Sequence, residues 1–205
     1  MEATSITPET AEKRYKGVTY KDIAKKIEAP SRHEAFVLFE NAKKRLNDIN
    51  NWQLFCGKSP AEFRLTDDMG NLLNSSIPHV GNLIKVRFHA PLSDGSNNYI
   101  WYRIQDFISG KNLLKDTEDF GFNVIQINTP YNKLEENDRE GITCTFLVTR
   151  SGCTVSAVEA ERTKVVFTKE FPFFIKMRDK ISGAFSMIHS SNHQWKSLLN
   201  GVLHY

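Results

Sequence analysis

The sequence predicts an α+β fold in which an antiparallel sheet packs against a long C-terminal helix. Three observations lead to this prediction. An amphipathic helix pattern begins at Ser31, a series of short alternating segments runs from Glu62 to Phe167, and one long amphipathic segment closes the chain from Phe174 to Leu203. The chain has 205 residues, 40% of them hydrophobic and 25% charged, so it can build one ordinary core.

The N-terminal region shows no hydrophobic period. Residues 1–17 mix Thr, Glu, Lys and Pro, which is typical of a flexible tail, and we expect 18–205 to form a single α+β domain. The segment Thr19–Ala29 is ambiguous. Its lysines and alanines favour a helix with Thr19 and Asp22 in a capping box, but it could also be a short edge strand that ends at Pro30.

The first clear element is a helix from Ser31 to Asp48. Ser31 and Glu34 have the spacing of a capping box, in which each residue satisfies a free backbone amide of the first turn. Apolar residues then recur at steps of four and three along one helical face: Ala35, Phe39, Ala42, Leu46 and Ile49.

Four segments after this helix are predicted strands: Glu62–Thr66, Leu83–His89, Tyr99–Phe107 and Gly121–Thr129. Side chains alternate between the two faces of a strand, so one face of each strand should be apolar. The expected core-facing residues are Ile84, Val86 and Phe88 in the second strand and Ile100, Tyr102 and Ile104 in the third.

The segment Ile142–Arg162 is predicted to be a hairpin with Ser151-Gly152 as its two-residue turn, because glycine supplies the positive φ of such turns. This register places Val148 opposite Val155, Phe146 opposite Ala157 and Cys144 opposite Glu159. The chain then closes with an apolar stripe at helical spacing, which Ser190-Ser191-Asn192 could split: Phe174, Met177, Ile181, Ala184, Ile188, Trp195, Leu198 and Val202.

No motif predicts catalysis or a bound metal. Gly57-Lys58-Ser59 resembles the end of a phosphate-binding loop, but Trp52 stands where that motif needs glycine. His189 and His193 lie four residues apart without a third ligand, and the three cysteines have neutral sequence neighbours. We therefore expect no catalytic residue, no metal site and no cofactor.

A second surface has a basic character. Lys85, Arg87 and Arg103 alternate with the core-facing residues, so we expect them to be exposed on the side of the sheet away from the last helix, where Trp101 joins them. Such a face could bind single-stranded nucleic acid. The net charge of only +3 and the acidic segments 116–119 and 135–138 make the nucleic-acid interpretation the weaker one.

The order of these elements resembles the START-like, polyketide-cyclase-like (helix-grip, SRPBCC) superfamily. The resemblance lies in Ile27–Ser31, the helix that leads to Trp52, the strands from Glu62 to Phe167 and the closing helix. It implies a curved antiparallel sheet and a cavity between that sheet and the last helix. The segments Ala61–Asp67 and Gln194–Leu199 also resemble motifs of a group of uncharacterised proteins, to which we attach no activity.

The resemblance implies non-enzymatic binding of a small hydrophobic ligand, since no catalytic motif of the superfamily can be carried over. The expected cavity walls are Ile84, Val86, Ile100, Tyr102, Phe146 and Phe185, with Tyr102 placing its polar tip inside. A structural or protein-interaction module with a solid core is the first alternative. Nucleic-acid binding on the basic face is the second, and an enzyme that uses the cavity is a further one.

The remaining sequence features concern location. No apolar run approaches the ~20 residues that cross a bilayer, so we expect no membrane span. The three cysteines, Cys56, Cys144 and Cys153, lack zinc-ribbon spacing, and residues 1–14 lack an apolar signal core. These features predict a reducing, cytoplasmic setting.

Overall fold

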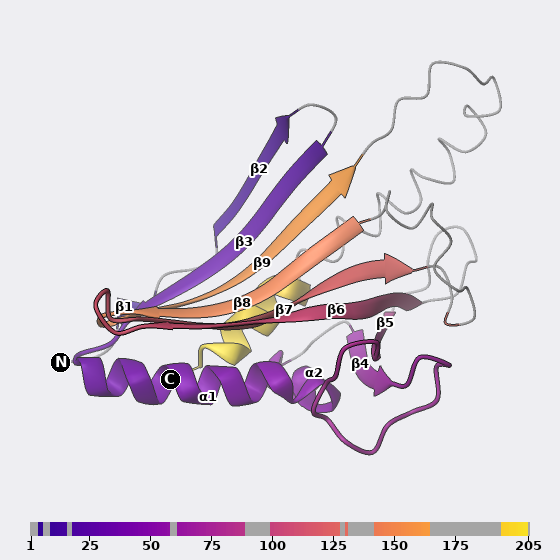
Figure 1. The fold of residues 1–205 in the computed structure, drawn as a ribbon, viewed down its shortest axis with the longest axis horizontal. Coiled ribbons are helices and arrows are strands. Elements are labelled where there is room, and N and C mark those ends of the chain that lie inside the picture. Colours follow the sequence, from indigo (N-terminus) through magenta and orange to yellow (C-terminus); the bar gives the residue numbers. More distant parts are fainter. Residues whose placement is uncertain are drawn as a thin grey trace.

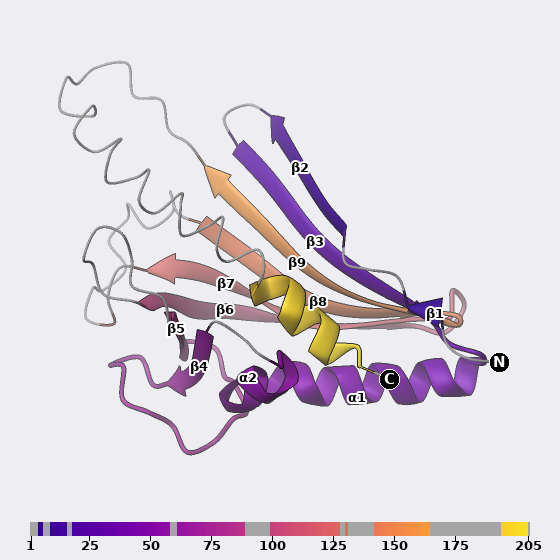
Figure 2. The ribbon, with the colours of Figure 1, turned by 180° about the vertical axis from the view of Figure 1, so that it is seen from behind.

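The computed structural model describes residues 4–5, 9–15, 18–57, 61–88, 99–127, 130, 142–164 and 194–204. Its main feature is a nine-stranded antiparallel sheet that curves around a C-terminal helix, which is yellow in Figures 1 and 2. The strands are β1 (Thr4–Ser5), β2 (Glu9–Tyr15), β3 (Val18–Glu28), β4 (Ala61–Thr66), β5 (Leu83–Phe88), β6 (Tyr99–Asn112), β7 (Thr117–Ile127), β8 (Ile142–Ser151) and β9 (Thr154–Lys164). The helices are α1 (Arg32–Asn47), the single 3-10 turn η1 (Ile49–Asn51), α2 (Trp52–Phe55) and the C-terminal helix at 194–202.

The strand order is β1-β3-β9-β8-β7-β6-β5-β4, and β2 pairs with β3 beside β1. The last strand therefore lies between β3 and the meander of the other strands, while the helices cover one face of the sheet (Figure 2). This arrangement is helix-grip-like, and the predicted α+β class with a curved antiparallel sheet and a C-terminal helix is confirmed. The part of the predicted long helix before residue 194 lies outside the described residues. No helix among those described is both long and apolar enough to cross a bilayer.

Helix α1 begins where the capping box predicts. The Ser31 side chain accepts a hydrogen bond from the backbone amide of Glu34 and donates one to the Glu34 carboxylate. The predicted apolar face is buried throughout and joins the main core: Ala35, Phe39, Ala42, Leu46 and Ile49. These contacts hold α1 against the concave face of the sheet.

The C-terminal helix docks against α1 and α2. Arg45 of α1 donates hydrogen bonds to the backbone oxygens of Gly201, Val202 and His204, which are the free carbonyls at the end of that helix. Gly201 lies so close to α2 that an added Cβ would come within 2.0 Å of the Phe55 carbonyl oxygen. The helix therefore reaches its place only with a residue that has no side chain at this contact.

The N-terminal region differs from the prediction. The flexible tail expected for residues 1–17 contains β1 and β2, which pair with the C-terminal and N-terminal parts of β3, respectively. Of the two possibilities for Thr19–Ala29, the structure has the strand. That strand is not at an edge, because β9 pairs with one of its sides and β1 and β2 pair with the other. Its lysines obscure the period that Ile23 and Ile27, both buried, would otherwise show.

The predicted register of the β8–β9 hairpin is wrong by two residues. Its turn is Gly152-Cys153, so Val148 pairs with Ala157 and Cys144 pairs with Glu161. Gly152 has φ +59° at the first turn position, as a type II′ turn requires. A shift of two residues leaves every side chain on its predicted face, because the strand period is two.

Strand β6 is longer than predicted and contains a register shift between Ile104 and Asp106. The additional residue reverses the alternation after Ile104, so that Phe107 contacts Phe122 of β7 with ring centroids 5.8 Å apart. Bulges of this kind bend a strand, and this one lies where β6 continues past the core.

The contact between Gly201 and Phe55 provides a test of the helix docking. Alanine is favoured over glycine inside helices by about 1 kcal/mol, so Gly201→Ala would stabilise an undocked helix. In the docked helix the new methyl group meets the Phe55 carbonyl oxygen at 2.0 Å, which belongs at the upper end of the ~1–3 kcal/mol that overpacking typically costs and outweighs that gain. We expect a lower midpoint in urea and a lower Tm.

The matched control is Gly110→Ala in β6. A Cβ at this position would meet the Asp119 side chain at 3.5 Å, an ordinary contact, and we expect little change in stability. A Gly201→Ala variant as stable as the wild type would show that the C-terminal helix does not pack against α2.

Candidate functional site

The concave face of the sheet carries the residues predicted to line a cavity. Ile84 and Val86 of β5 lie opposite Tyr102 and Ile100 of β6, and all four are buried in the main core. Phe146 of β8 is buried on the same face. The sixth predicted residue, Phe185, lies outside the described residues.

Trp195 of the C-terminal helix connects the two parts of this wall. Its ring centroid lies 5.1 Å from that of Phe146 and 6.2 Å from that of Tyr102. On the far side of Phe146, Trp52 of α2 packs with a centroid distance of 5.5 Å. The wall is therefore lined by aromatic rings contributed by two sheet strands and two helices.

Two polar side chains at the start of the C-terminal helix are buried in this aromatic setting. Gln194 and Trp195 are 0% and 1% exposed. Within the described part of the chain, the amide oxygen and nitrogen of Gln194 and the indole Nε1 of Trp195 have no hydrogen-bond partner. A buried indole N–H normally has a hydrogen-bond partner, and that of Trp52 donates to the Leu46 carbonyl oxygen.

An acidic cluster lies on the same concave face. Along β9, Val155, Ala157, Glu159 and Glu161 all point inward, and both glutamates are buried. Glu159 is 0% exposed. The Cys144 thiol lies close enough to interact with its carboxyl group, but neither carboxyl oxygen meets hydrogen-bond geometry with any described residue. One ligand atom from each of Cys144, Glu159 and Glu161 lies within 4.8 Å of the other two, close enough for the three to face one cation.

The groups of this cluster perturb one another's pKa values. Burial, followed by the negative charge of Glu161, raises the pKa of Glu159 to about 8, and the positive charge of Lys21 opposes that rise. Burial, followed by the negative charge of Glu159, raises the pKa of the Cys144 thiol well above its ordinary value. Lys21 lies on β3 directly opposite Glu161.

Tyr102 connects the acidic cluster to the aromatic wall. Burial raises the pKa of its phenol well above the usual range, and the next contributions come from Cys144, Glu161 and Glu159. The predicted polar tip of the cavity wall therefore lies within electrostatic reach of the cluster. The wall and the cluster form one continuous surface.

The predicted hairpin register places Glu159 opposite Cys144, but neither glutamate was assigned to a site. Cys144 has neutral neighbours along the chain, and its acidic neighbours come from β9, one strand away. The available signal is the alternation of β9, which places Glu159 and Glu161 in phase with the buried Val155 and Ala157. A glutamate at the inward phase of a central strand is rare enough to mark a candidate site.

The basic face is only partly as predicted. Lys85, Arg87 and Arg103 lie on the convex side, where Arg87 is exposed and the other two are half-buried. Trp101 is buried in a small outer cluster with Leu83, and the Lys85 ammonium lies 5.0 Å from the centroid of its ring. Trp101 therefore offers no open ring face on which a base could stack.

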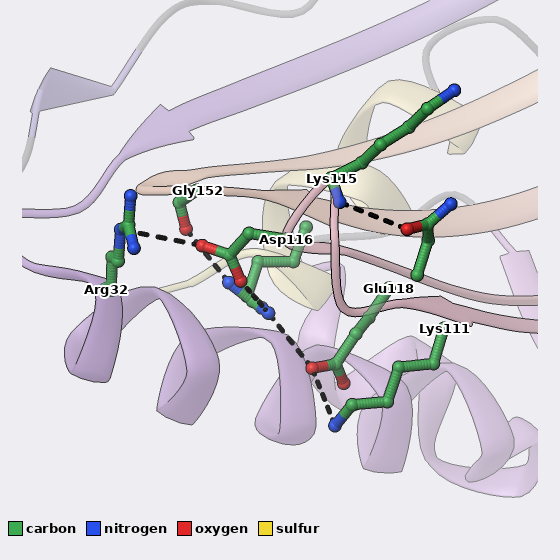
Figure 3. Close-up of polar contacts among 8 residues, drawn as sticks. Arg32, Lys111, Lys115, Asp116, Glu118 and Gly152 are labelled. Atoms are coloured by element: carbon green, nitrogen blue, oxygen red, sulfur yellow. Dashed lines mark hydrogen bonds and ion pairs between the residues drawn. The ribbon is translucent and has the colours of Figure 1, made fainter.

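A second polar cluster lies at the opposite end of the hairpins (Figure 3). Buried Arg150 donates hydrogen bonds to Asp116, Glu118 and the Gly152 carbonyl, while Arg32 and Lys111 pair with the same two carboxylates. The adjacent groove has a volume of about 440 Å³ and is lined by Phe36, Phe39, Glu40, Lys43, Ser109, Gly110, Lys111, Glu118 and Asp119. The abundance of partners indicates a structural role, joining two hairpin turns to the start of α1.

Most of the other sequence candidates lie outside the described residues. Gly57 is exposed with φ +65°, while Lys58, Ser59, His189 and His193 lie outside the described residues. Cys56 and Cys153 form no disulfide within the part of the chain that the structure describes.

Comparisons with known proteins do not assign the chain to a family. No family model matches it, and no curated protein matches it at a significant level. Among solved structures, a hypothetical protein, jhp0584, from Helicobacter pylori has 9% identity and a TM-score of 0.38 over 78% of each chain. The crystal structure of Ara h 8.0201 has 14% identity and a TM-score of 0.37, over 92% of this chain and 100% of that one. At these TM-scores the likeness supports no conclusion about function.

The raised pKa of Glu159 predicts a pH dependence of stability. In the unfolded chain a glutamate titrates near pH 4.5, so between that pH and about 8 the folded chain holds the proton more tightly. The free energy of unfolding should therefore fall as pH rises through this window, by up to a few kcal/mol. In Glu159→Gln the decline should be much smaller.

Urea unfolding of both proteins between pH 5 and pH 8.5, in a buffer with a chelator, measures this difference. Asp68→Asn changes an exposed carboxylate and should keep the wild-type profile. Parallel profiles for the wild type and Glu159→Gln would show that Glu159 is ionised throughout.

Proposed function

We propose that the chain binds a small hydrophobic ligand, without catalysis, between the concave face of the sheet and the C-terminal helix. The observation that carries the proposal is the set of partnerless polar atoms on Gln194 and Trp195 within an aromatic and aliphatic wall. Ligand sites combine such walls with a few polar groups that orient the ligand.

Burying the polar atoms of Gln194 and Trp195 without partners destabilises the folded protein. A buried donor or acceptor without a partner costs about 1–3 kcal/mol. A ligand with one carbonyl or hydroxyl group could accept a hydrogen bond from Trp195 and exchange another with Gln194. Its apolar remainder would contact Ile84, Ile100 and Phe146, so the proposal keeps the predicted wall residues as ligand contacts.

A protein-interaction module with a solid core is the second candidate, and two observations favour it. The rings of Trp52, Phe122 and Phe146 pack against one another with centroid distances of 5.5 to 6.3 Å, as a filled core would. In addition, α2 and the segment between β4 and β5 expose several large apolar side chains: Leu54, Met69, Leu72, Ile77 and Val80. Exposed apolar residues that gather in one region suit a partner surface.

Titration with an uncharged, fluorescent acylnaphthalene probe, whose ketone oxygen can accept a hydrogen bond, separates the two candidates in chelator-containing buffer. We expect saturable binding that Trp195→Phe weakens about 3- to 10-fold, because this change keeps a ring but removes the indole donor. Trp101→Phe, the control on the convex face, should bind like the wild type. No saturable binding, or equal binding by both variants, would withdraw the ligand proposal and favour the interaction module.

A further inference from the structure

We propose that Cys144, Glu159 and Glu161 bind one divalent transition-metal cation, with Zn²⁺ the best match. The ligand atoms of the three residues lie within 4.8 Å of one another in the buried interior. Two atoms bound to one tetrahedral zinc are about 3.2–3.7 Å apart, given bonds of about 2.0–2.3 Å. Small side-chain movements would therefore complete the site. The inference does not rest on the hydrophobic ligand.

The backbone holds these ligands in place. Cys144 and Glu161 are direct cross-strand partners in β8 and β9, and Glu159 is the next inward residue of β9. Both strands lie in the middle of the sheet, where β7 and β3 pair with their outer sides. Ligands on rigid central strands lose little conformational freedom on binding, which favours a preformed site.

Glu159 provides a second observation that points to a bound cation. Its carboxylate is fully buried and faces the other two ligands, and neither oxygen has a hydrogen-bond partner within the described ranges. A buried carboxyl group without a hydrogen-bond partner is costly in either protonation state, and in its charged form it needs a cationic partner or a metal. A bound cation would supply that partner.

The ligand types select the class of metal. A thiolate is a soft ligand that favours Zn²⁺ or Co²⁺, whereas Ca²⁺ and Mg²⁺ prefer sets made entirely of oxygen. Three protein ligands leave a fourth zinc position for water or a ligand atom, as in zinc sites that are not purely structural.

Titration of the chelator-treated full-length chain with Co²⁺ tests the site, because a Co²⁺–thiolate bond gives a near-ultraviolet charge-transfer band. We expect one Co²⁺ per chain with this band, displaced by Zn²⁺. Cys144→Ser should lose the band, and Glu159→Gln should bind at least about 10-fold more weakly. Cys153→Ser and Cys56→Ser, which alter the other two cysteines, should behave like the wild type.

Circular dichroism identifies any variant that fails to fold, and a rise in the wild-type Tm on adding stoichiometric Zn²⁺ tests the site without a variant. The proposal is overturned if wild type gives no stoichiometric band and no rise in Tm. It is also overturned if the band survives Cys144→Ser or disappears in Cys153→Ser. Because no organic ligand is present, a negative result leaves the hydrophobic-ligand proposal intact.

Discussion

The insertion of β9 between β3 and β8 is the constraint on which the rest of the structure depends. Without it, β3 and the meander from β4 to β8 would be two separate sheets, since β9 is the strand that pairs with both. Its inward side chains therefore have neighbours on two strands: Glu161 lies opposite Lys21 on one side and Cys144 on the other. The same pairing that closes the sheet assembles the buried polar cluster. Any substitution there affects stability and site together.

The second determinant is the position of the C-terminal helix. Arg45 holds the last carbonyls of this helix, and Gly201 allows its close approach to α2. With that end fixed, Trp195 at the other end is brought between Phe146 and Tyr102. The polar atoms of Gln194 and Trp195 thus reach the interior as a consequence of helix docking. Their burial costs free energy that a simpler apolar helix would avoid, which is why we interpret them as functional.

Local signals explain what the sequence could predict. The capping box at Ser31 and the stripe from Ala35 to Ile49 define α1 because helix ends and faces depend on neighbouring residues. The inward faces of β5 and β6 follow from alternation for the same reason. The register of the β8–β9 hairpin is harder to predict, because Ser151-Gly152 and Gly152-Cys153 both place glycine in a two-residue turn. Alternation does not distinguish registers that differ by two residues.

Non-local features were not predictable in this way. The strand character of residues 9–15 comes from pairing with β3, and their composition alone resembles that of a tail. The surroundings of Cys144 depend on which residues of β9 lie beside it. The predicted register set Glu159 opposite Cys144, but only the actual register and the pairing with β3 bring Glu159, Glu161 and Lys21 together around it. Of the predicted cavity wall, five residues are brought to one face by the sheet, but the polar groups that give this face its chemistry come from β9 and the last helix.

The two polar clusters of this protein contrast in a way that bears on function. Around Arg150, a buried charge has several partners: two carboxylates and a backbone carbonyl (Figure 3). Around Glu159, two carboxylates and a thiol lie beside Lys21, and the Glu159 oxygens have no hydrogen-bond partner in the described chain. Both clusters include the β8–β9 hairpin, so strand geometry alone does not account for the difference. A structural cluster can be completed during folding by the chain itself, whereas a buried carboxylate that is left without a hydrogen-bond partner retains an attraction for a cation from solution.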